Sequence, residues 1–133
     1  MAGSLEKILR DTDVSLQVLQ VLMEASYDSI LVTDATKAAK IVYANNAFKT
    51  LTGYAPSEVI GKTPRILQGP GTDKKVIARL GKALKKGSKF EGRAINYRKD
   101  RTPFIMYWRV LPVKVGSQTK LWVAIQREGF VIH

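Results

Sequence analysis

The sequence predicts an α+β fold, in which a five-stranded antiparallel sheet carries short helices on one face and follows a further helix. Two apolar segments with the composition of strands occur early in the chain, and three more occur at its end. Between these groups, the apolar residues recur with the spacing of helices. The length of 133 residues suits one domain with a single hydrophobic core. The expected strands cover residues 29–34, 40–45, 89–98, 102–115 and 119–128.

The N-terminal segment, residues 4–25, has helical spacing with a break at Asp11–Thr12–Asp13, and Asp13 is a suitable cap for the second piece. That second piece is apolar over most of its circumference, which is typical of a helix that needs a partner surface. Its apolar residues are Val14, Leu16, Val18, Leu19, Val21, Leu22, Met23 and Ala25.

Local signals also delimit the helices between the two groups of strands. Asn45 is the expected cap of a helix that ends at Gly53, and residues 55–58 begin another helical turn. The spacing of residues 72–87 predicts an amphipathic helix with its basic face toward solvent, and Gly87 ends it.

Two-residue alternation divides the side chains of the last three strands between two faces of the sheet. The inner face, toward the helices, is apolar except for the amides of Asn96 and Gln126. A buried amide without a partner costs about 1–3 kcal/mol, so these amides need hydrogen bonds. Two interpretations stay open: the amides bond backbone or each other, or both face the edge of a planar ligand. The inner face carries Phe90, Gly92, Ala94, Asn96, Met106, Trp108, Val110, Trp122, Ala124 and Gln126.

The outer face of the sheet is apolar as well, so it must be covered. The N-terminal helix is the available cover, either on its own sheet or on that of a second copy. We therefore expect a homodimer through the outer sheet face and the N-terminal helix, with Ile125 at its centre. The apolar residues of the outer face are Ile95, Tyr97, Ile105, Tyr107, Leu111, Leu121, Val123 and Ile125.

The residue inventory excludes several kinds of chemistry. The chain has no cysteine and a single histidine, His133, so thiol nucleophiles, zinc or haem sites and His-based triads are not expected. No paired carboxylates, nucleophile–base set or phosphate loop is found either. The sequence therefore predicts no metal site, no catalytic residue and no enzyme.

Charge and hydropathy bear on partners and location. The net charge is +11, but the lysines are spread out and form no recognition-helix pattern, so a specific nucleic-acid partner is not expected. No apolar run is long enough to span a bilayer, and the N-terminus lacks the apolar core of a secretory signal. The sequence thus predicts no membrane contact and a cytoplasmic location.

Four phrases resemble the PAS superfamily and, within it, the LOV branch of flavin photosensors. They are IVYANNAFKTLTGYAPSEVIGK, RILQGPGTD, INYRKDRTPF and WVAIQRE. The resemblance implies the PAS/LOV fold for residues 28–128, with a helical cap or dimerisation segment at 1–27 and a short tail at 129–133.

Four positions match residues that hold the flavin in this family. By this resemblance, Arg65 pairs with the flavin phosphate and Gln68 bonds the ribityl chain. Asn96 reads the polar edge of the isoalloxazine ring, and Gln126 senses its N5/O4 side and passes the signal to the sheet.

Other positions depart from the family pattern. Thr63 replaces an asparagine at the ribityl chain, and its hydroxyl is a partial substitute. Gly81 replaces a second phosphate arginine, a charge that Lys82 or Arg79 nearby would have to supply. Met106 replaces the second asparagine at the ring edge, and a thioether cannot reproduce two amide hydrogen bonds.

Pro64 stands at the position of the photoactive cysteine, so light-driven formation of a cysteinyl adduct is excluded. The proline also has a structural reading. Because proline favours the first turn of a helix and pushes the residue before it into extended geometry, Thr63–Pro64 suits the start of a short helix.

The resemblance implies a sensory domain that holds FMN or FAD, weakly or not at all, and signals through a rearranged dimer. The alternative is a flavin-free PAS module for dimerisation or partner binding, whose pocket Met106 and the two tryptophans fill. No output domain follows residue 128, so a separate downstream partner, unidentified by the sequence, is expected. Electron donors for a bound flavin would be Trp108, Trp122, Tyr97 or Tyr107.

Overall fold

The structure is a computed structural model that describes residues 2–130, so residues 131–133 of the expected tail lie outside it. Its elements follow the predicted order, and each strand agrees with its predicted range to within one residue at either end. The helices are α1 (Ala2–Leu9), α2 (Thr12–Ala25), α3 (Asn46–Thr52), α4 (Pro56–Val59), the 3-10 helix η1 (Pro64–Leu67) and α5 (Lys74–Lys86). The strands are β1 (Ser29–Asp34), β2 (Ile41–Ala44), β3 (Phe90–Tyr97), β4 (Pro103–Val115) and β5 (Gln118–Glu128).

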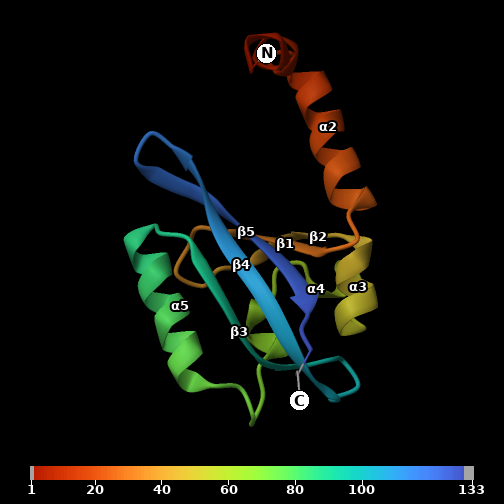
Figure 1. Ribbon diagram of the computed structural model, residues 1–133, viewed down its shortest axis with the longest axis vertical. Helices are drawn as coiled ribbons and strands as arrows, with labels where there is room; N and C mark the ends of the chain where they lie inside the picture. Colours follow the sequence, from red (N-terminus) through yellow and green to blue (C-terminus); the bar gives the residue numbers. More distant parts are fainter. Residues whose placement is uncertain (1, 131–133) are drawn as a thin grey trace.

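The five strands form one antiparallel sheet in the order β2-β1-β5-β4-β3 (Figure 1). β1 and β5 pair from Ser29↔Gln126 to Asp34↔Leu121, so the centre of the sheet joins two segments that are far apart in the sequence. The helices after β2 gather on one side of the sheet, and side chains from α3, α4 and η1 enter the same core cluster as its inner face. The predicted α+β fold is confirmed.

The inner face of the sheet is the floor of the core, as the two-residue alternation predicts. On β4 and β5 every second residue is buried through the middle of the strand. On β3 the buried residues are Phe90, Ala94 and Asn96. Phe48 of α3, Val59 of α4 and Leu67 of η1 close the core from the other side.

Helix α5 lies beside the core as an amphipathic cover. The Asp73 side chain accepts a hydrogen bond from Lys75 N at 2.8 Å, and Gly87 ends the helix in the left-handed region at a φ of 65°. A side chain at Gly87 would be strained there. No residue of α5 is fully buried, and its apolar residues Val76, Leu80, Ala83 and Leu84 pack half-buried against the core.

The N-terminal segment forms two helices, as expected from the break at residues 11–13, but the cap of α2 is Asp11 and not Asp13. The Asp11 carboxylate accepts from Asp13 N at 3.0 Å and from Val14 N at 3.2 Å. Both aspartates suit a cap, and the one at the start of the helix makes the hydrogen bonds. Among residues 2–130, no helix is long and apolar enough to cross a membrane.

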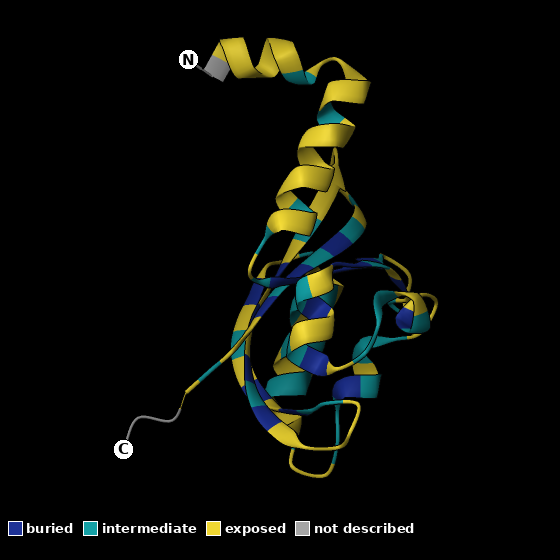
Figure 2. Cartoon of the chain, turned by 90° about the vertical axis from the view of Figure 1, so that its right-hand side faces the viewer, coloured by how far each residue is buried: buried dark blue, intermediate teal, exposed yellow. Residues whose placement is uncertain are grey.

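Helix α2 projects away from the sheet instead of covering it (Figures 1 and 2). No residue of α2 is buried, and Val21 and Leu22 are 64% and 62% exposed. The outer sheet face stays open at Ile95 and Tyr107, which are 38% and 41% exposed. Within one chain, therefore, the N-terminal helix does not act as the expected cover of its own sheet.

One buried side chain, Asn45, fastens the base of α2 to the sheet. Its Oδ1 accepts from Ile30 N at 2.9 Å and from Phe48 N at 3.1 Å, the second bond being the predicted helix cap. Its Nδ2 donates to the backbone oxygens of Met23 at 2.7 Å and Asp28 at 3.0 Å. Asn45 thus links the last turn of α2, the start of β1 and the start of α3.

Replacement of Asn45 tests this junction. We expect Asn45→Ala to lower the free energy of unfolding by about 2–4 kcal/mol, because it removes four hydrogen bonds and leaves buried backbone groups without partners. Urea denaturation measures the loss. The matched control is Asn46→Ala at the exposed neighbouring position, which should change stability by less than about 0.5 kcal/mol. Equal losses in the two variants would contradict the assignment.

Candidate functional site

The inner face of β3, β4 and β5 brings together three of the residues singled out in the sequence. Asn96, Met106 and Gln126 are 6%, 2% and 4% exposed. The register places Ala94 opposite Met106 and Trp108 opposite Gln126, so the three side chains lie in adjacent rows across three strands. They form the polar part of an otherwise apolar floor.

The two buried amides bond neither backbone nor each other. Asn96 Nδ2 donates to Met106 Sδ at 3.5 Å, and Gln126 Oε1 accepts from Ser29 Oγ at 3.0 Å. A thioether is a weak acceptor, so the first contact contributes little. Within the described residues, the opposite ends of the two amides, Asn96 Oδ1 and Gln126 Nε2, make no hydrogen bond.

Aromatic side chains form the rest of the floor beside the amides. Trp108 packs against Phe90 with ring centroids 5.2 Å apart and planes tilted by 47°, a favourable arrangement for aromatic pairs. Trp122 is buried in the same cluster. Of the aromatics considered as electron donors, Tyr107 lies on the outer face, and the Tyr97 hydroxyl accepts from Gly71 N at 2.7 Å. Only the two tryptophans belong to the inner face.

The residues expected at the far end of a ligand lie around η1. Thr63 precedes this helix in extended geometry, with a φ of −100° and a ψ of 154°, and its side chain makes no capping bond. Pro64 occupies the first helical position, as predicted. Leu67 is buried and anchors η1, Gln68 is half-buried at the helix end, and Arg65 is exposed to solvent.

Gly81, the position where the family has a second phosphate arginine, has open space around it. A Cβ placed on Gly81 would meet no atom within 4 Å. Arg79 is committed elsewhere, because its Nη1 donates to Glu91 O at 3.0 Å and its guanidinium stacks 4.8 Å from the centre of the Phe90 ring. Lys82 is exposed and remains the nearby cation on α5.

These residues fit the two ends of a flavin unequally. At the ring end, the free ends of two buried amides on one apolar floor match the acceptors and donors along an isoalloxazine edge. Met106 fills that floor, but its side chain has three rotatable bonds and can be displaced. At the phosphate end, Arg65 is the one retained arginine. The donor set therefore fits the ring closely and the phosphate less well.

In the described residues, the one side-chain polar atom that is fully shielded from solvent and has no partner lies outside this site, whereas Asn96 Oδ1 and Gln126 Nε2 have no partner but keep some contact with solvent. The shielded atom is the Tyr43 hydroxyl, on β2. Burial raises the pKa of Tyr43, and the Glu24 carboxylate raises it further. Among residues 2–130, no group of three or more His, Cys, Asp or Glu side chains could hold a metal ion.

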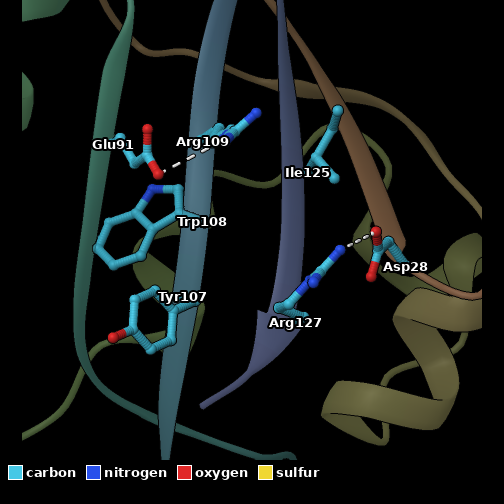
Figure 3. Close-up of a pocket in the computed structure, with 7 residues that line it drawn as sticks. All are labelled: Asp28, Glu91, Tyr107, Trp108, Arg109, Ile125 and Arg127. Atoms are coloured by element: carbon cyan, nitrogen blue, oxygen red, sulfur yellow. Dashed lines mark hydrogen bonds and ion pairs between the residues drawn. The ribbon is translucent and has the colours of Figure 1, made fainter.

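The outer face is more charged than the apolar residues of its strands suggested. A groove of about 360 Å³ runs across β3, β4 and β5 there (Figure 3). It contains the ion pairs Arg109–Glu91 at 3.5 Å and Arg127–Asp28 at 2.7 Å. Because side chains alternate between the two faces along these strands, the arginines lie on the same face as Ile125. The apolar outer face expected from the sequence is therefore a mixed one.

Comparison with known proteins places the chain among light-sensing relatives. The sequence profile of the PAS domain family matches residues 28–128. The chain is 41% identical over 99 residues to "Phototropin-2" of Oryza sativa subsp. japonica, a match that covers 74% of this chain and 11% of that protein. It is 45% identical over 77 residues to "Blue-light-activated histidine kinase" of Brucella anthropi, covering 58% of this chain and 16% of that protein.

A solved structure shows the same fold over most of both chains. It is described as "Flavin Analogue Sheds Light on Light-Oxygen-Voltage Domain Mechanism" and superposes with a TM-score of 0.78 at 32% identity, covering 86% of this chain and 85% of that one. The curated relatives are much longer, and the chain spans only 11% and 16% of their lengths.

The different bonding of the two amides predicts opposite effects on stability without a ligand. Asn96→Leu should leave the free energy of unfolding unchanged or raise it by about 1 kcal/mol, because a weakly bonded buried amide is replaced by an apolar group of similar size. Gln126→Leu should lower the free energy of unfolding by about 1–2 kcal/mol, because the substitution leaves the buried Ser29 hydroxyl without a hydrogen-bond partner. Thermal or urea denaturation of both variants measures this, and a larger loss for Asn96→Leu would show that the amide is structural.

Proposed function

This chain belongs to the PAS domain family as a LOV-like sensory domain without a cysteine, and we propose that it binds a flavin, FMN or FAD, without forming a cysteinyl adduct. The observation that carries the proposal is the pair of buried amides, Asn96 and Gln126, which lie on the otherwise apolar inner face and each keep one end without a hydrogen bond within the described residues. Light-sensing relatives and a flavin-related LOV structure support the same ligand class.

Each residue of the site has a distinct part in this proposal. Asn96 Oδ1 and Gln126 Nε2 would hold the ring edge, and Met106 would have to move to admit the ring. Gln68 and Thr63 lie along the ligand's chain, and Arg65 closes on its phosphate. When bound, the flavin supplies blue-light absorption and redox chemistry. Pro64 presents no thiol, so no covalent bond forms to the protein.

A short series of contacts would carry a change at the ligand to α2. Gln126 accepts from Ser29 at the start of β1. The backbone oxygen of the preceding Asp28 accepts from Asn45, which also holds Met23 in the last turn of α2. A rotation of the Gln126 amide would therefore alter the hydrogen bond of Ser29, one residue from the junction that fixes α2.

A flavin-free PAS module is the second candidate, and one observation favours it. Met106 is only 2% exposed and contacts Asn96, so its side chain packs in the space beside that amide. The solvent exposure of Arg65 and the loss of a cation at Gly81 point the same way. In this case the domain serves dimerisation or protein binding.

Either candidate needs a partner for its exposed apolar surfaces, and we propose a homodimer. In this arrangement the outer sheet face and α2 of two copies cover one another. Charge gives partial support to the pairing, because residues 1–27 carry four acidic and two basic side chains and the outer face of the sheet presents three arginines. Those arginines are Arg93, Arg109 and Arg127, of which the last two already pair with Glu91 and Asp28.

Repair of two of the departures, Met106 and Gly81, tests flavin binding. We expect Met106→Asn to tighten FMN binding about tenfold, because it restores an amide at the ring edge. Gly81→Arg should also tighten binding, by an amount that shrinks at high salt, since the added side chain has open space and meets a phosphate. Titration calorimetry and the visible absorption of the flavin measure both.

The control for added charge is Gly3→Arg, in α1, where a Cβ also meets no atom within 4 Å. It should leave FMN affinity unchanged. If neither Met106→Asn nor Gly81→Arg binds FMN better than the parent, the flavin proposal fails and the flavin-free module stands.

Light scattering tests the homodimer. We expect the parent to be a dimer at tens of micromolar and Ile125→Asp to be a monomer, because the aspartate would be buried without a partner at the centre of the interface. Val42→Asp, on the exposed side of the edge strand β2, is the matched control and should leave the dimer intact. A monomeric parent would refute the proposal.

A further inference from the structure

A dense group of lysines covers α5 and the hairpin beside its C-terminal end. A side chain at Gly87, which ends α5, would lie 3.5 Å from Lys114 Nζ, so the β4–β5 hairpin reaches the end of the helix. All members of the group are exposed. This lysine surface consists of Lys74, Lys75, Lys82, Lys85, Lys86, Lys89, Lys114 and Lys120.

The lysine surface has little counter-charge of its own, since Asp73, which caps α5, is the one acidic residue that directly adjoins its helix lysines in the sequence. No acidic residue occurs in residues 74–90 or 101–127. The ion pairs of the described residues use Arg98, Lys99, Arg109 and Arg127, and none of them uses a lysine of this surface. Arg79, the remaining cation of α5, points to β3 and is bonded there. The positive charge of the surface is therefore not neutralised within the described chain.

Helical spacing directs the lysines of α5 to one side. At 100° per residue, those at positions 74, 75, 82, 85 and 86 fall within an arc of about 120°, and the apolar residues that contact the core fall on the other side. Because that apolar side packs against the core, the exposed side of α5 offers cations, the small side chain of Ala78, and no aromatic or large apolar group.

Helix stability does not account for this arrangement. Lys74 and Lys75 lie in the first turn of α5, where the one acidic side chain is that of the N-cap residue, Asp73. Cations at this end oppose the helix dipole, whereas Lys85 and Lys86 at the other end agree with it. Lysines occur along the whole helix, including the N-terminal end, where the helix dipole disfavours cations.

We propose that the lysine surface binds the phosphate backbone of duplex nucleic acid without reading its sequence. Exposed lysines that lack counter-charges match phosphates by charge alone, and such contacts carry no base information. This agrees with the absence of a recognition-helix pattern in the sequence. Single strands are disfavoured because the surface has no aromatic group on which bases stack. A membrane is disfavoured because an interfacial helix inserts its apolar face, and here that face packs against the core.

Salt dependence of binding is the decisive measurement. The probe is a fluorescent 20-base-pair duplex of arbitrary sequence, followed by anisotropy without added flavin. If the protein contacts about five phosphates, the slope of log K against log salt is about −4.5, and affinity falls about 500-fold between 50 and 200 mM salt. A second duplex of scrambled sequence should bind equally well.

Matched charge variants locate the surface. Lys75→Gln/Lys85→Gln/Lys86→Gln should weaken binding at least tenfold at 100 mM salt and make the slope about 2.7 less steep. The control Lys37→Gln/Lys40→Gln/Lys49→Gln removes the same charge from exposed positions on β1–β2 and α3 and should bind like the parent. Circular dichroism confirms that both variants keep the fold.

Three results would overturn the inference. These are no binding by the parent at 50 mM salt, equal weakening by the two triple variants, or a preference for one of the duplex sequences. A fourth arm uses phosphatidylserine vesicles. If they bind the parent more tightly than the duplex does, and the α5 variant loses that binding, the surface belongs to a membrane and the nucleic-acid proposal is wrong.

Discussion

The two-residue alternation of β3, β4 and β5 is the constraint on which the rest of the structure depends. One register places Asn96, Met106 and Gln126 under the helices and Arg93, Arg109 and Arg127 on the opposite side. A shift by one residue would exchange the two sets and bury unpaired arginines. The candidate ligand site and the candidate interface are therefore two sides of the same strands, separated by the thickness of one sheet.

Features set by neighbouring residues could be predicted from the sequence. The strands, the Asn45 cap and the Gly87 terminator follow from local chemistry, and the structure has all of them. Asp11 and Asp13 are both good caps two residues apart, so the sequence could not choose between them. The partners of the amides depend on packing between strands far apart in the chain, which explains why Met106 Sδ and Ser29 Oγ were not foreseen.

The departures from the family pattern fall at both ends of the candidate site, at Met106 on the inner face and at Gly81 on α5, but the residues that remain differ in their surroundings. The amides at the ring end are retained and buried, whereas the positions at the phosphate end are open or exposed, as Gly81 and Arg65 illustrate. A planar head group and a charged tail are recognised by different physics, the first by hydrogen bonds in a low dielectric and the second by cations near water. The two ends of the site can thus change independently, and the chain retains more of the first.

Because α2 projects from the sheet, a small rotation at its base would produce a larger displacement at its far end. Its 14 residues extend about 21 Å at 1.5 Å per residue, and the helix meets the body of the protein at one junction around Asn45. For a rigid rod of that length, a 10° pivot at the base moves the far end by about 4 Å. A small change in the hydrogen bonds at this junction would therefore move the far end of the helix by a distance comparable to the size of a side chain.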